Sequence, residues 1–472
     1  SRVACAKLRG RKPMPPDEPT YTPTYAPSER PSSVATAEPT SSAGTAEPTY
    51  GPSSSPSKSI RAAIVDNPQM KTLQDLTSTF TKDTGIAVVF DVFTEEELRE
   101  QFLSGDPTAF IDKYDALMLG PLYANIYGAE GVLEDLSAKA GDEYDIDDLV
   151  SNFKDAMSVD DVMYAAPFYG ESSFLMYRKD LLDDAGQTMP DNPTWEDVKK
   201  IAKEMDVDGD MPPRTAGICL RDMPGWSSMG ATFTTMLNTY GGTWWLDADG
   251  KIGESQVMEP EFKAALSDYT DLAIQWGGEN PPANFLQCLE AYKNGEVALW
   301  YDSTAAAGLL EEEGSPVKGK NGYAQAPVKD TPSSAWIWVW GFGIPTGSSS
   351  KDHAWRFISW ATGPDYFKQA AAATGYASVP VARTSTLEDA DYMTASAPFL
   401  ESMKTAYESA DPENPGVQPR PGFGGVQYVG VEEFPAVGDA CTEEFAKVIS
   451  GDTDIDKALE ACDKVASEAT EM

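Results

Sequence analysis

Histidine is almost absent from this chain of 472 residues, which has a single one, His353. A Ser-His-Asp or Cys-His catalytic group would have to use that residue. It stands in the segment SSSKDHAW, at the expected start of a helix, where a solvated surface position is the ordinary outcome. Catalysis that depends on histidine is therefore not expected.

Cysteine is scarce as well, with five residues. Five are too few for a disulfide-rich scaffold, and none forms the close C-x-x-C pair that structural zinc sites use. The acidic segment 206–210 lacks the residue order of an EF-hand loop, so we expect an acidic loop there. Neither a metal nor a cofactor is expected.

Basic residues are few: Lys and Arg number 36 against 75 Asp and Glu, and the net charge is −39. This balance argues against nucleic acid as a partner, because phosphate binding needs a basic surface. It also argues against an anionic membrane surface, and no stretch reaches the roughly 18–20 apolar residues of a membrane span. The acidity indicates a strongly solvated surface suited to salty or extracytoplasmic surroundings. A basic partner is the weaker alternative.

The first 59 residues differ in kind from the rest. They begin with the basic run SRVACAKLRGRK and continue as a Pro/Ser/Thr/Ala tract in which Glu-Pro-Thr recurs at 18–20, 38–40 and 47–49. Such a stretch cannot bury enough apolar surface to offset its chain entropy. We expect a disordered tether or leader remnant. Residues 1–59 have seven basic and five acidic side chains, so the net negative charge of the chain comes entirely from residues 60–472.

From Ile60 onward, short apolar runs alternate with amphipathic helical patterns. The apolar runs cover 60–65, 86–93 and 114–119. This rhythm predicts an α/β fold with a parallel sheet that has helices on both faces. Ligands of such sheets bind at the carboxyl ends of the strands, which here are Asn67, Thr94 and Tyr123.

Short segments in a recognisable order run through residues 60–470: DALMLGPLY (115–123), YAAPFYGESSFLMYRKDLL (164–182), AGQTMPDNPTWEDV (185–198), GICLRDMPGW (217–226), LNTYGGTWW (237–245), NGEVALWYDSTAAAG (294–308), WIWVWGFGIP (336–345), FISWATGPDY (357–366) and RTSTLEDADYM (383–393). Each alone is weakly specific. The ordered set resembles the extracellular solute-binding proteins of bacterial ABC transporters (family 1, maltose-binding-protein-like), and most closely their sorbitol/mannitol-binding branch.

The resemblance implies a two-lobed periplasmic-binding-protein type II fold in which the chain crosses between the lobes three times. We place the crossings near 168–172, 300–302 and 361–365. Lobe one is then 60–169 plus 302–362, and lobe two is 172–299 plus 365–472. Residues 1–59 are outside the family pattern.

Capture of a neutral polyol or sugar needs carboxylates and amides as acceptors, Arg and amides as donors, and aromatic rings for the C–H faces. Side chains of these types fall at the predicted strand ends and crossings. For Glu171 the alternative is a solvated loop carboxylate, and for Arg221 it is a surface ion pair. The candidates are Asn67, Gln69, Tyr123 and Asp302 in lobe one, Glu171 at a crossing, and Arg221, Trp226 and Tyr376 in lobe two.

Three tryptophans, Trp336, Trp338 and Trp340, alternate with apolar residues and would share one face of a strand. Trp340, beside Gly341, is the candidate for stacking on a ligand. The alternative is that all three belong to the lobe core, and the same two interpretations apply to Trp244 and Trp245.

The resemblance implies a binding protein rather than an enzyme, one that closes on a polyol or sugar and delivers it to an ABC permease in a membrane; we expect a monomer. A second hypothesis is a repurposed binding fold that acts in assembly or surface interaction, suggested by the unusual leader. A third, less favoured, is a glycoside-active enzyme, because two of the many carboxylates would suffice.

An extracytoplasmic location is favoured, periplasmic or at the cell surface. Val3-Ala4-Cys5 could be an altered lipobox with Cys5 as the lipid anchor, although the expected leucine is missing. The basic, acid-poor leader also fits the end of an organelle transit peptide, which would place the protein in an algal plastid.

Residues 434–449 and 455–470 read as two helices joined by Ser450-Gly451-Asp452-Thr453. Cys441 and Cys462 lie at equal distances from this turn, so they face each other if both point inward, with small alanines beside them. A disulfide between them is expected in an oxidising compartment. Cys219 and Cys288 have no such symmetry and are expected to stay reduced.

Overall fold

The structure, a computed structural model, describes residues 58–95, 97–99, 107–206, 215–277, 282–379 and 381–471. Cys5 and most of the leader lie outside these ranges, as does most of the acidic segment 206–210. Lys58 and Ser59, which the sequence assigned to the leader, begin the first strand. None of the described helices is long and apolar enough to cross a membrane.

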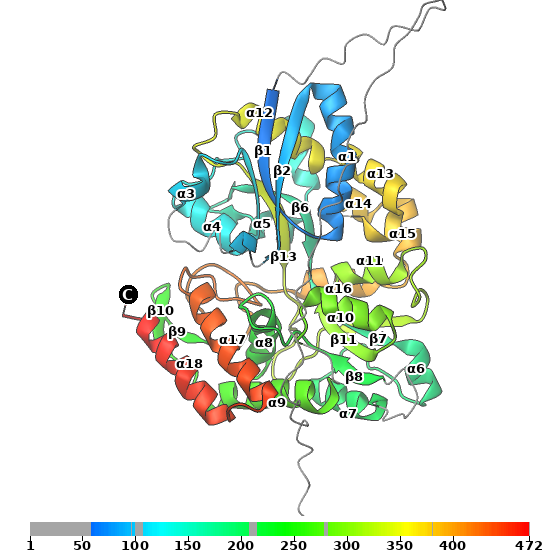
Figure 1. The fold of residues 1–472 in the computed structure, drawn as a ribbon, viewed down its shortest axis with the longest axis vertical. Coiled ribbons are helices and arrows are strands. Elements are labelled where there is room, and N and C mark those ends of the chain that lie inside the picture. Colours follow the sequence, from blue (N-terminus) through cyan, green and yellow to red (C-terminus); the bar gives the residue numbers. More distant parts are fainter. Residues whose placement is uncertain are drawn as a thin grey trace, which may run out of the picture. The chain divides into compact units, whose positions relative to one another are not determined.

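The first sheet has five strands in a mixed arrangement (Figure 1). β1 pairs in parallel with β2 and β3, as the alternating pattern predicted, whereas β13 enters antiparallel between β3 and β6. The central strand β3 is fully buried, because helices cover both faces of the sheet. In sheet order the strands are β2 (Ile86–Phe93), β1 (Lys58–Val65), β3 (Ala116–Leu119), β13 (Trp338–Gly343) and β6 (Ala165–Glu171).

Helices α1 and α12 pack beside this sheet with their apolar faces inward. Asn67 caps α1 by accepting from the Met70 N–H, and Pro68 fits the first turn, where no amide donor is needed. The helices on this sheet are α1 (Pro68–Thr84), α3 (Thr108–Ile111), α4 (Pro121–Ala129), α5 (Ser151–Ala156), α12 (Lys351–Ala361) and α13 (Pro364–Thr374). Shorter elements are η1 (Asp142–Tyr144), η2 (Ile146–Asp148), η3 (Tyr376–Ser378), α14 (Thr384–Leu387), α15 (Ala390–Ala395), β4 (Ser158–Val159) and β5 (Val162–Met163).

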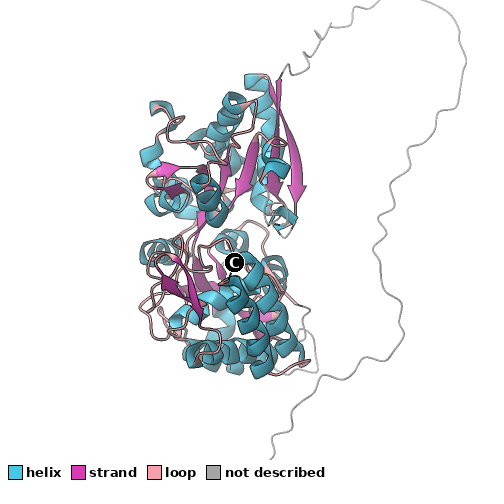
Figure 2. Ribbon diagram, turned by 90° about the vertical axis from the view of Figure 1, so that its left-hand side faces the viewer, coloured by secondary structure: helices cyan, strands magenta, loops and turns pink. Residues whose placement is uncertain are grey.

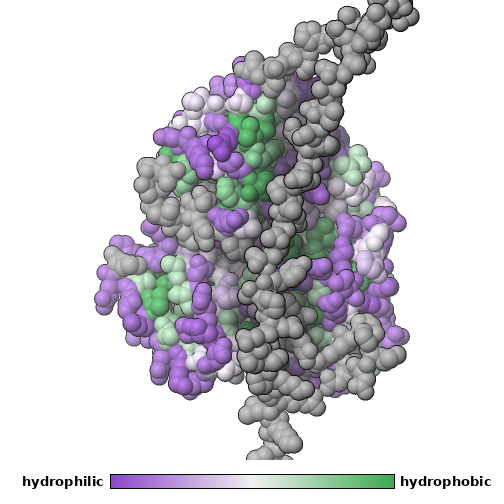
Figure 3. All heavy atoms as spheres, viewed as in Figure 1, coloured by the Kyte–Doolittle hydropathy of each residue, from purple (hydrophilic) through white to green (hydrophobic). Residues whose placement is uncertain are grey.

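The second sheet lies below the first in Figure 2 and has four strands. Its strand β11 is buried along its whole length. Its strands are β12 (Asn321–Gln325), β7 (Ser173–Arg178), β11 (Val297–Ser303) and β8 (Ala216–Cys219). The other elements of this lobe are α6 (Lys179–Asp184), α7 (Trp195–Met205), α8 (Met229–Thr239), β9 (Trp245–Ala248), β10 (Lys251–Ser255), α9 (Pro260–Trp276), α10 (Phe285–Lys293), α11 (Ala305–Glu311), α16 (Leu400–Ser409), α17 (Phe434–Ser450) and α18 (Ile455–Ala469). Much of the coloured surface in Figure 3 is hydrophilic, consistent with the excess of acidic residues.

The chain passes between the two sheets three times, at positions that differ in part from those expected. The first passage is at Ser172, between β6 and β7. The second lies at 326–337 rather than 300–302, because β11 continues to Ser303 and β12 still pairs with β7. The third lies between α13, which packs on α1, and α16, which packs on β7 and β12. It is not at 361–365, because Pro364 there starts α13 beside α12.

Two disulfides are present among the described residues. Cys441 on α17 and Cys462 on α18 are bonded, with Cα atoms 4.7 Å apart. Gly451 ends α17 with φ of 81°, and Asp454 caps α18 by accepting from the Lys457 N–H. The expectation that Cys219 and Cys288 stay reduced is wrong: they form the second disulfide, with Cα atoms 5.7 Å apart. Their 69-residue separation hid a contact that the packing of α10 beside β8 creates.

Candidate functional site

A cavity of about 320 Å³ opens where the two sheets meet. Its walls come from residues after β1 and β2 in the first lobe, from segments after β8 and before α10 in the second, and from the connecting strands β6 and β13. This position agrees with the rule that α/β sheets bind ligands at the carboxyl ends of their strands. The cavity is the candidate ligand site.

Strands β6 and β13 form the aromatic wall of the cavity. In their antiparallel register Trp338 lies opposite Glu171 and Trp340 lies opposite Tyr169. Directly opposed residues put their side chains on the same face, so these four side chains share one face of the sheet. All four line the cavity, and Trp336, just before β13, lines it as well.

Gly120 sets the position of the Trp338 indole. A Cβ atom at Gly120 would lie 2.2 Å from Cζ2 of Trp338, closer than any real contact. Gly120, which directly follows β3, therefore lets the indole ring pack against the backbone. This contact fixes the position of one aromatic ring in the cavity wall.

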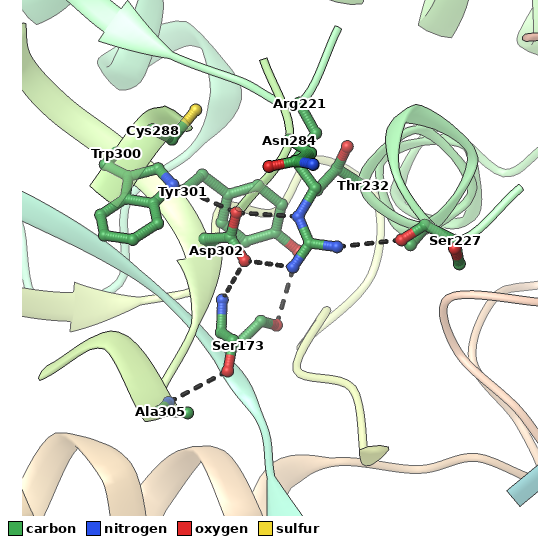
Figure 4. Close-up of polar contacts among 12 residues, drawn as sticks. Ser173, Arg221, Ser227, Thr232, Asn284, Cys288, Trp300, Tyr301, Asp302 and Ala305 are labelled. Atoms are coloured by element: carbon green, nitrogen blue, oxygen red, sulfur yellow. Dashed lines mark hydrogen bonds and ion pairs between the residues drawn. The ribbon is translucent and has the colours of Figure 1, made fainter. Parts of the chain in front are cut away.

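Arg221 and Asp302 form a buried ion pair on the second lobe (Figure 4). Arg221 donates from Nε to Oδ2 of Asp302 at 2.9 Å and from Nη2 to Oδ1 at 2.6 Å, and its Nη1 donates to the Ser227 carbonyl at 2.9 Å. Burial alone would lower the pKa of Arg221, but the Asp302 carboxylate raises it above its ordinary value. The guanidinium is thus held as a cation in one orientation at the cavity wall.

Asp302 is itself fully buried and lies behind Arg221. It also accepts from Nε1 of Trp300 at 3.1 Å and from the Ser303 N–H at 2.6 Å. Asp302 is therefore a positioning residue for Arg221 and does not line the cavity, contrary to its predicted role as a direct ligand contact.

Trp226 joins the two lobes at the far wall. Its indole faces the guanidinium carbon of Arg99, 5.1 Å from the ring centroid, and its ring lies 6.5 Å from that of Tyr123. Both partners belong to the first lobe, whereas the backbone N–H of Trp226 donates to Oδ1 of Asp439 on α17. The structure therefore shows the lobes in contact across the site.

Several buried polar atoms on the cavity wall have no hydrogen-bond partner among the described residues. They are Nε1 of Trp226, Nε1 of Trp336, Oγ of Ser227, Oγ of Ser228 and Oε1 of Gln427. These residues are between 1% and 6% exposed. Because buried polar groups without partners are costly, this set of donors and acceptors is matched to a hydroxylated ligand.

Glu171 is the carboxyl group at the centre of the site, where β6 leaves the first sheet. Burial raises its pKa to about 8; the nearby Asp302 and Glu95 add to the shift, and the Ser303 hydroxyl and Arg221 oppose it. At neutral pH Glu171 is therefore mostly protonated and can both donate and accept.

The structure brings six of the nine sequence-predicted ligand residues to the cavity wall: Asn67, Gln69, Glu171, Arg221, Trp226 and Trp340. Asp302 lies behind Arg221. Tyr123 on α4 packs behind Trp226, and Tyr376 on η3 packs against Phe367, with ring centroids 6.1 Å apart, outside the cavity. Trp244 and Trp245 are fully buried in the second lobe.

Sequence reasoning missed other lining residues. Tyr169 is two residues from Glu171 on one strand, so period-two alternation could have found it. Glu95 follows directly after the strand end at Thr94. Ser227, Phe285 and Gln427 come from loops whose course the sequence does not indicate.

The sequence of the chain is similar to those of known solute-binding proteins. Residues 65–366 match the family of bacterial extracellular solute-binding proteins. The chain is 32% identical to the mannitol-binding protein of Pseudomonas aeruginosa over 420 residues, which are 88% of this chain and 93% of that protein.

Two solved structures extend the comparison. An ABC transporter solute-binding protein from Agrobacterium vitis S4, with bound D-mannitol, matches with a TM-score of 0.82 at 35% identity and covers 88% of this chain and 99% of its own. One from Agrobacterium radiobacter K84, in complex with ribitol, matches with a TM-score of 0.75 at 23% identity over the same shares, which supports the fold alone. The fold is that of two-lobed, maltose-binding-protein-like solute-binding proteins, and the chain belongs to the bacterial extracellular solute-binding protein family.

Proposed function

We propose that this protein captures a linear polyol between its two lobes and presents it to an ABC permease. The observation that carries the proposal is the cavity itself, in which aromatic rings and buried polar atoms without partners face one another. A polyol offers both apolar C–H faces and hydroxyls that donate and accept, so it satisfies both parts of this wall. The mannitol-binding relative and the mannitol-bound neighbour support the same ligand class.

Closure of the lobes is part of the proposal. Residues from both lobes and from the connecting strands line the cavity, so a ligand that touches all of them stabilises the closed arrangement by its differential affinity. A permease that binds the closed surface would then distinguish the loaded protein from the empty one.

The family places the protein outside the cytoplasm, and we propose that it works there as a monomer. A lipid anchor at Cys5, which lies outside the described residues, would keep it near the membrane.

Calorimetric titration of the purified protein with D-mannitol, D-sorbitol, ribitol, erythritol and maltose tests the proposal. We expect heat from at least one polyol and turnover of none. Silence from every polyol, or binding of maltose alone, would contradict it.

A pair of variants tests whether the polyol binds in the cavity. Trp340→Leu removes a ring from the cavity wall and should weaken polyol binding at least tenfold, about 1.4 kcal/mol. Trp360→Leu changes a half-buried ring on α12 outside the cavity and should leave the affinity within about twofold. Equal effects of the two changes would place the ligand elsewhere.

A further inference from the structure

The charges on the cavity wall are unbalanced. Three carboxyl groups line it, Asp66, Glu95 and Glu171, and Arg221 is the single basic side chain among the described lining residues. The wall also presents buried polar atoms without partners, so the carboxyl groups belong to a site built for a ligand rather than to an ordinary acidic surface.

The available cations are already paired. Both Asp302 oxygens accept from Arg221, and the Ser227 carbonyl accepts from the same guanidinium. Arg99, beside the cavity, pairs with Glu95. An incoming anion would therefore meet cations whose charge a carboxylate already balances, and it could gain a positive partner of its own only by breaking an ion pair, which for the buried Arg221–Asp302 pair is strongly unfavourable.

Glu171 has no basic partner of its own in the part of the chain that the structure describes. The charged groups that act on it are Arg221, whose charge Asp302 balances, and Asp302 and Glu95, which repel it. The phenols of Tyr169 and Tyr407 also face it, and its charge acts on both. It stands where β6 leaves the first lobe, so a ligand between the lobes lies against it.

We infer that the site selects its hydroxylated ligands by charge: it excludes anionic polyols, such as aldonates and phosphorylated alditols, and accepts a polyol that carries a protonated amine, which pairs with Glu171. This inference rests on the proposed polyol-binding function. It adds a ligand class, the amino-alditols, to the neutral polyols.

An ammonium group suits the position because it brings three donors and no acceptor to an unpaired carboxyl group. Burial holds the pKa of Glu171 at about 8, so the free protein carries a proton there at pH 7. When the ammonium binds, that proton leaves Glu171 for the buffer, and a carboxylate–ammonium pair remains. A neutral polyol leaves the proton in place.

The test uses three ligands with one carbon skeleton: D-mannitol, 1-amino-1-deoxy-D-mannitol and D-mannonate. At pH 7 they are neutral, cationic and anionic. Because the two ends of mannitol are equivalent, the amine can be presented at either end of the site. Titrations at pH 7 in two buffers of different ionisation enthalpy give the affinity and the number of protons released.

The expected order is amine tighter than mannitol and mannitol tighter than mannonate, with at least a hundredfold between the two extremes. The amine should release close to one proton and mannitol close to none. An amine that binds more weakly than mannitol, or a mannonate affinity within a hundredfold of the amine, overturns the inference. Because mannitol is in the series, mannitol binding with the wrong order defeats the inference alone. Absence of binding by all three also overturns the inference, and it defeats the proposed function as well only if the other polyols of the panel do not bind.

Two variants, each of which removes one carboxylate, separate a local effect from the charge of the whole chain. In Glu171→Gln the ratio of amine to mannitol affinity should fall at least tenfold and proton release should disappear. Glu254→Gln, which changes an exposed carboxylate on β10 outside the cavity wall, should keep both. An unchanged ratio in Glu171→Gln, or an equal loss in Glu254→Gln, counts against Glu171 as the partner of the amine.

Discussion

Glu171 and Arg221 line the same cavity, but only Arg221 has an oppositely charged partner of its own. Arg221 is held in one orientation by Asp302, whereas Glu171 is half-buried and has no cation of its own among the described residues. The effect of the Glu171 carboxyl group on stability and the effect of Asp302 on Arg221 can each be measured with a single substitution.

Glu171 should make the stability of the protein fall as pH rises. Its pKa is about 8 in the folded protein against an ordinary 4.5, so the folded state holds a proton that the unfolded state loses. The stability contribution is complete below pH 4.5 and is lost as pH rises through about 8, by roughly 1.4 kcal/mol per pKa unit at most. Urea denaturation of wild type and Glu171→Gln at pH 5, 7 and 9 should show the variant gaining relative stability at high pH. Parallel pH profiles would contradict the assignment.

Asp302→Asn should destabilise the second lobe by about 3–5 kcal/mol, because it leaves the buried Arg221 charge without its partner. Polyol affinity should fall as well, since the guanidinium loses its orientation. Chemical denaturation and calorimetry measure the two effects. Asp147→Asn, an exposed carboxylate on η2, is the matched change and should cost less than about 0.5 kcal/mol.

At the scale of elements, the site depends on how closely the connecting strands approach their neighbours. β13 pairs with β3 and β6 in the first sheet, and its tryptophans point into the cavity beside Gly120. The loop and first turn of α10 supply another wall, and a disulfide ties that helix to β8.

Gly120→Ala should weaken polyol binding at least tenfold with a stability loss of only about 1–3 kcal/mol, because the added methyl group must displace the Trp338 indole. Gly141→Ala is the control, since a Cβ there meets nothing within 4 Å. If calorimetry finds the two variants equal in affinity, the position of Trp338 is not important for binding.

The two disulfides should have different roles. Replacing Cys219 and Cys288 by serine should cost about 2–4 kcal/mol and also weaken binding, because α10 carries Asn284 and Phe285 into the cavity. Replacing Cys441 and Cys462 should cost stability without changing affinity, because no described residue of α17 or α18 is part of the cavity wall itself. Melting curves and titrations of the two double variants check this, and a loss of affinity confined to the second pair would contradict it.

At the scale of the whole molecule, the α/β class and the two-lobed fold could be predicted because apolar runs and family segments are local features of the sequence. The parallel pairing of β1 with β2 and β3 followed from the same alternation. The second passage between lobes could not be placed, because β12 looks like any short strand until its pairing with β7 is known.

In the candidate site, too, some features could be predicted from the sequence and others could not. Asn67 and Arg221, proposed as ligand contacts from their position in the chain, both line the candidate cavity. Asp302 was assigned the wrong role because its residue type does not reveal whether it faces the ligand or a neighbouring arginine. Gln427 reaches the cavity from a long loop and has no local signal.

The central claim is that the protein holds a polyol between its two lobes, and a crystal structure of its complex with D-mannitol tests it most directly. The account predicts mannitol in the cavity, with its C–H face against Trp338 and Trp340 and its hydroxyls on Arg221, Glu171 and the buried polar atoms of Trp226 and Trp336. Mannitol bound to one lobe alone, or outside this cavity, would contradict it.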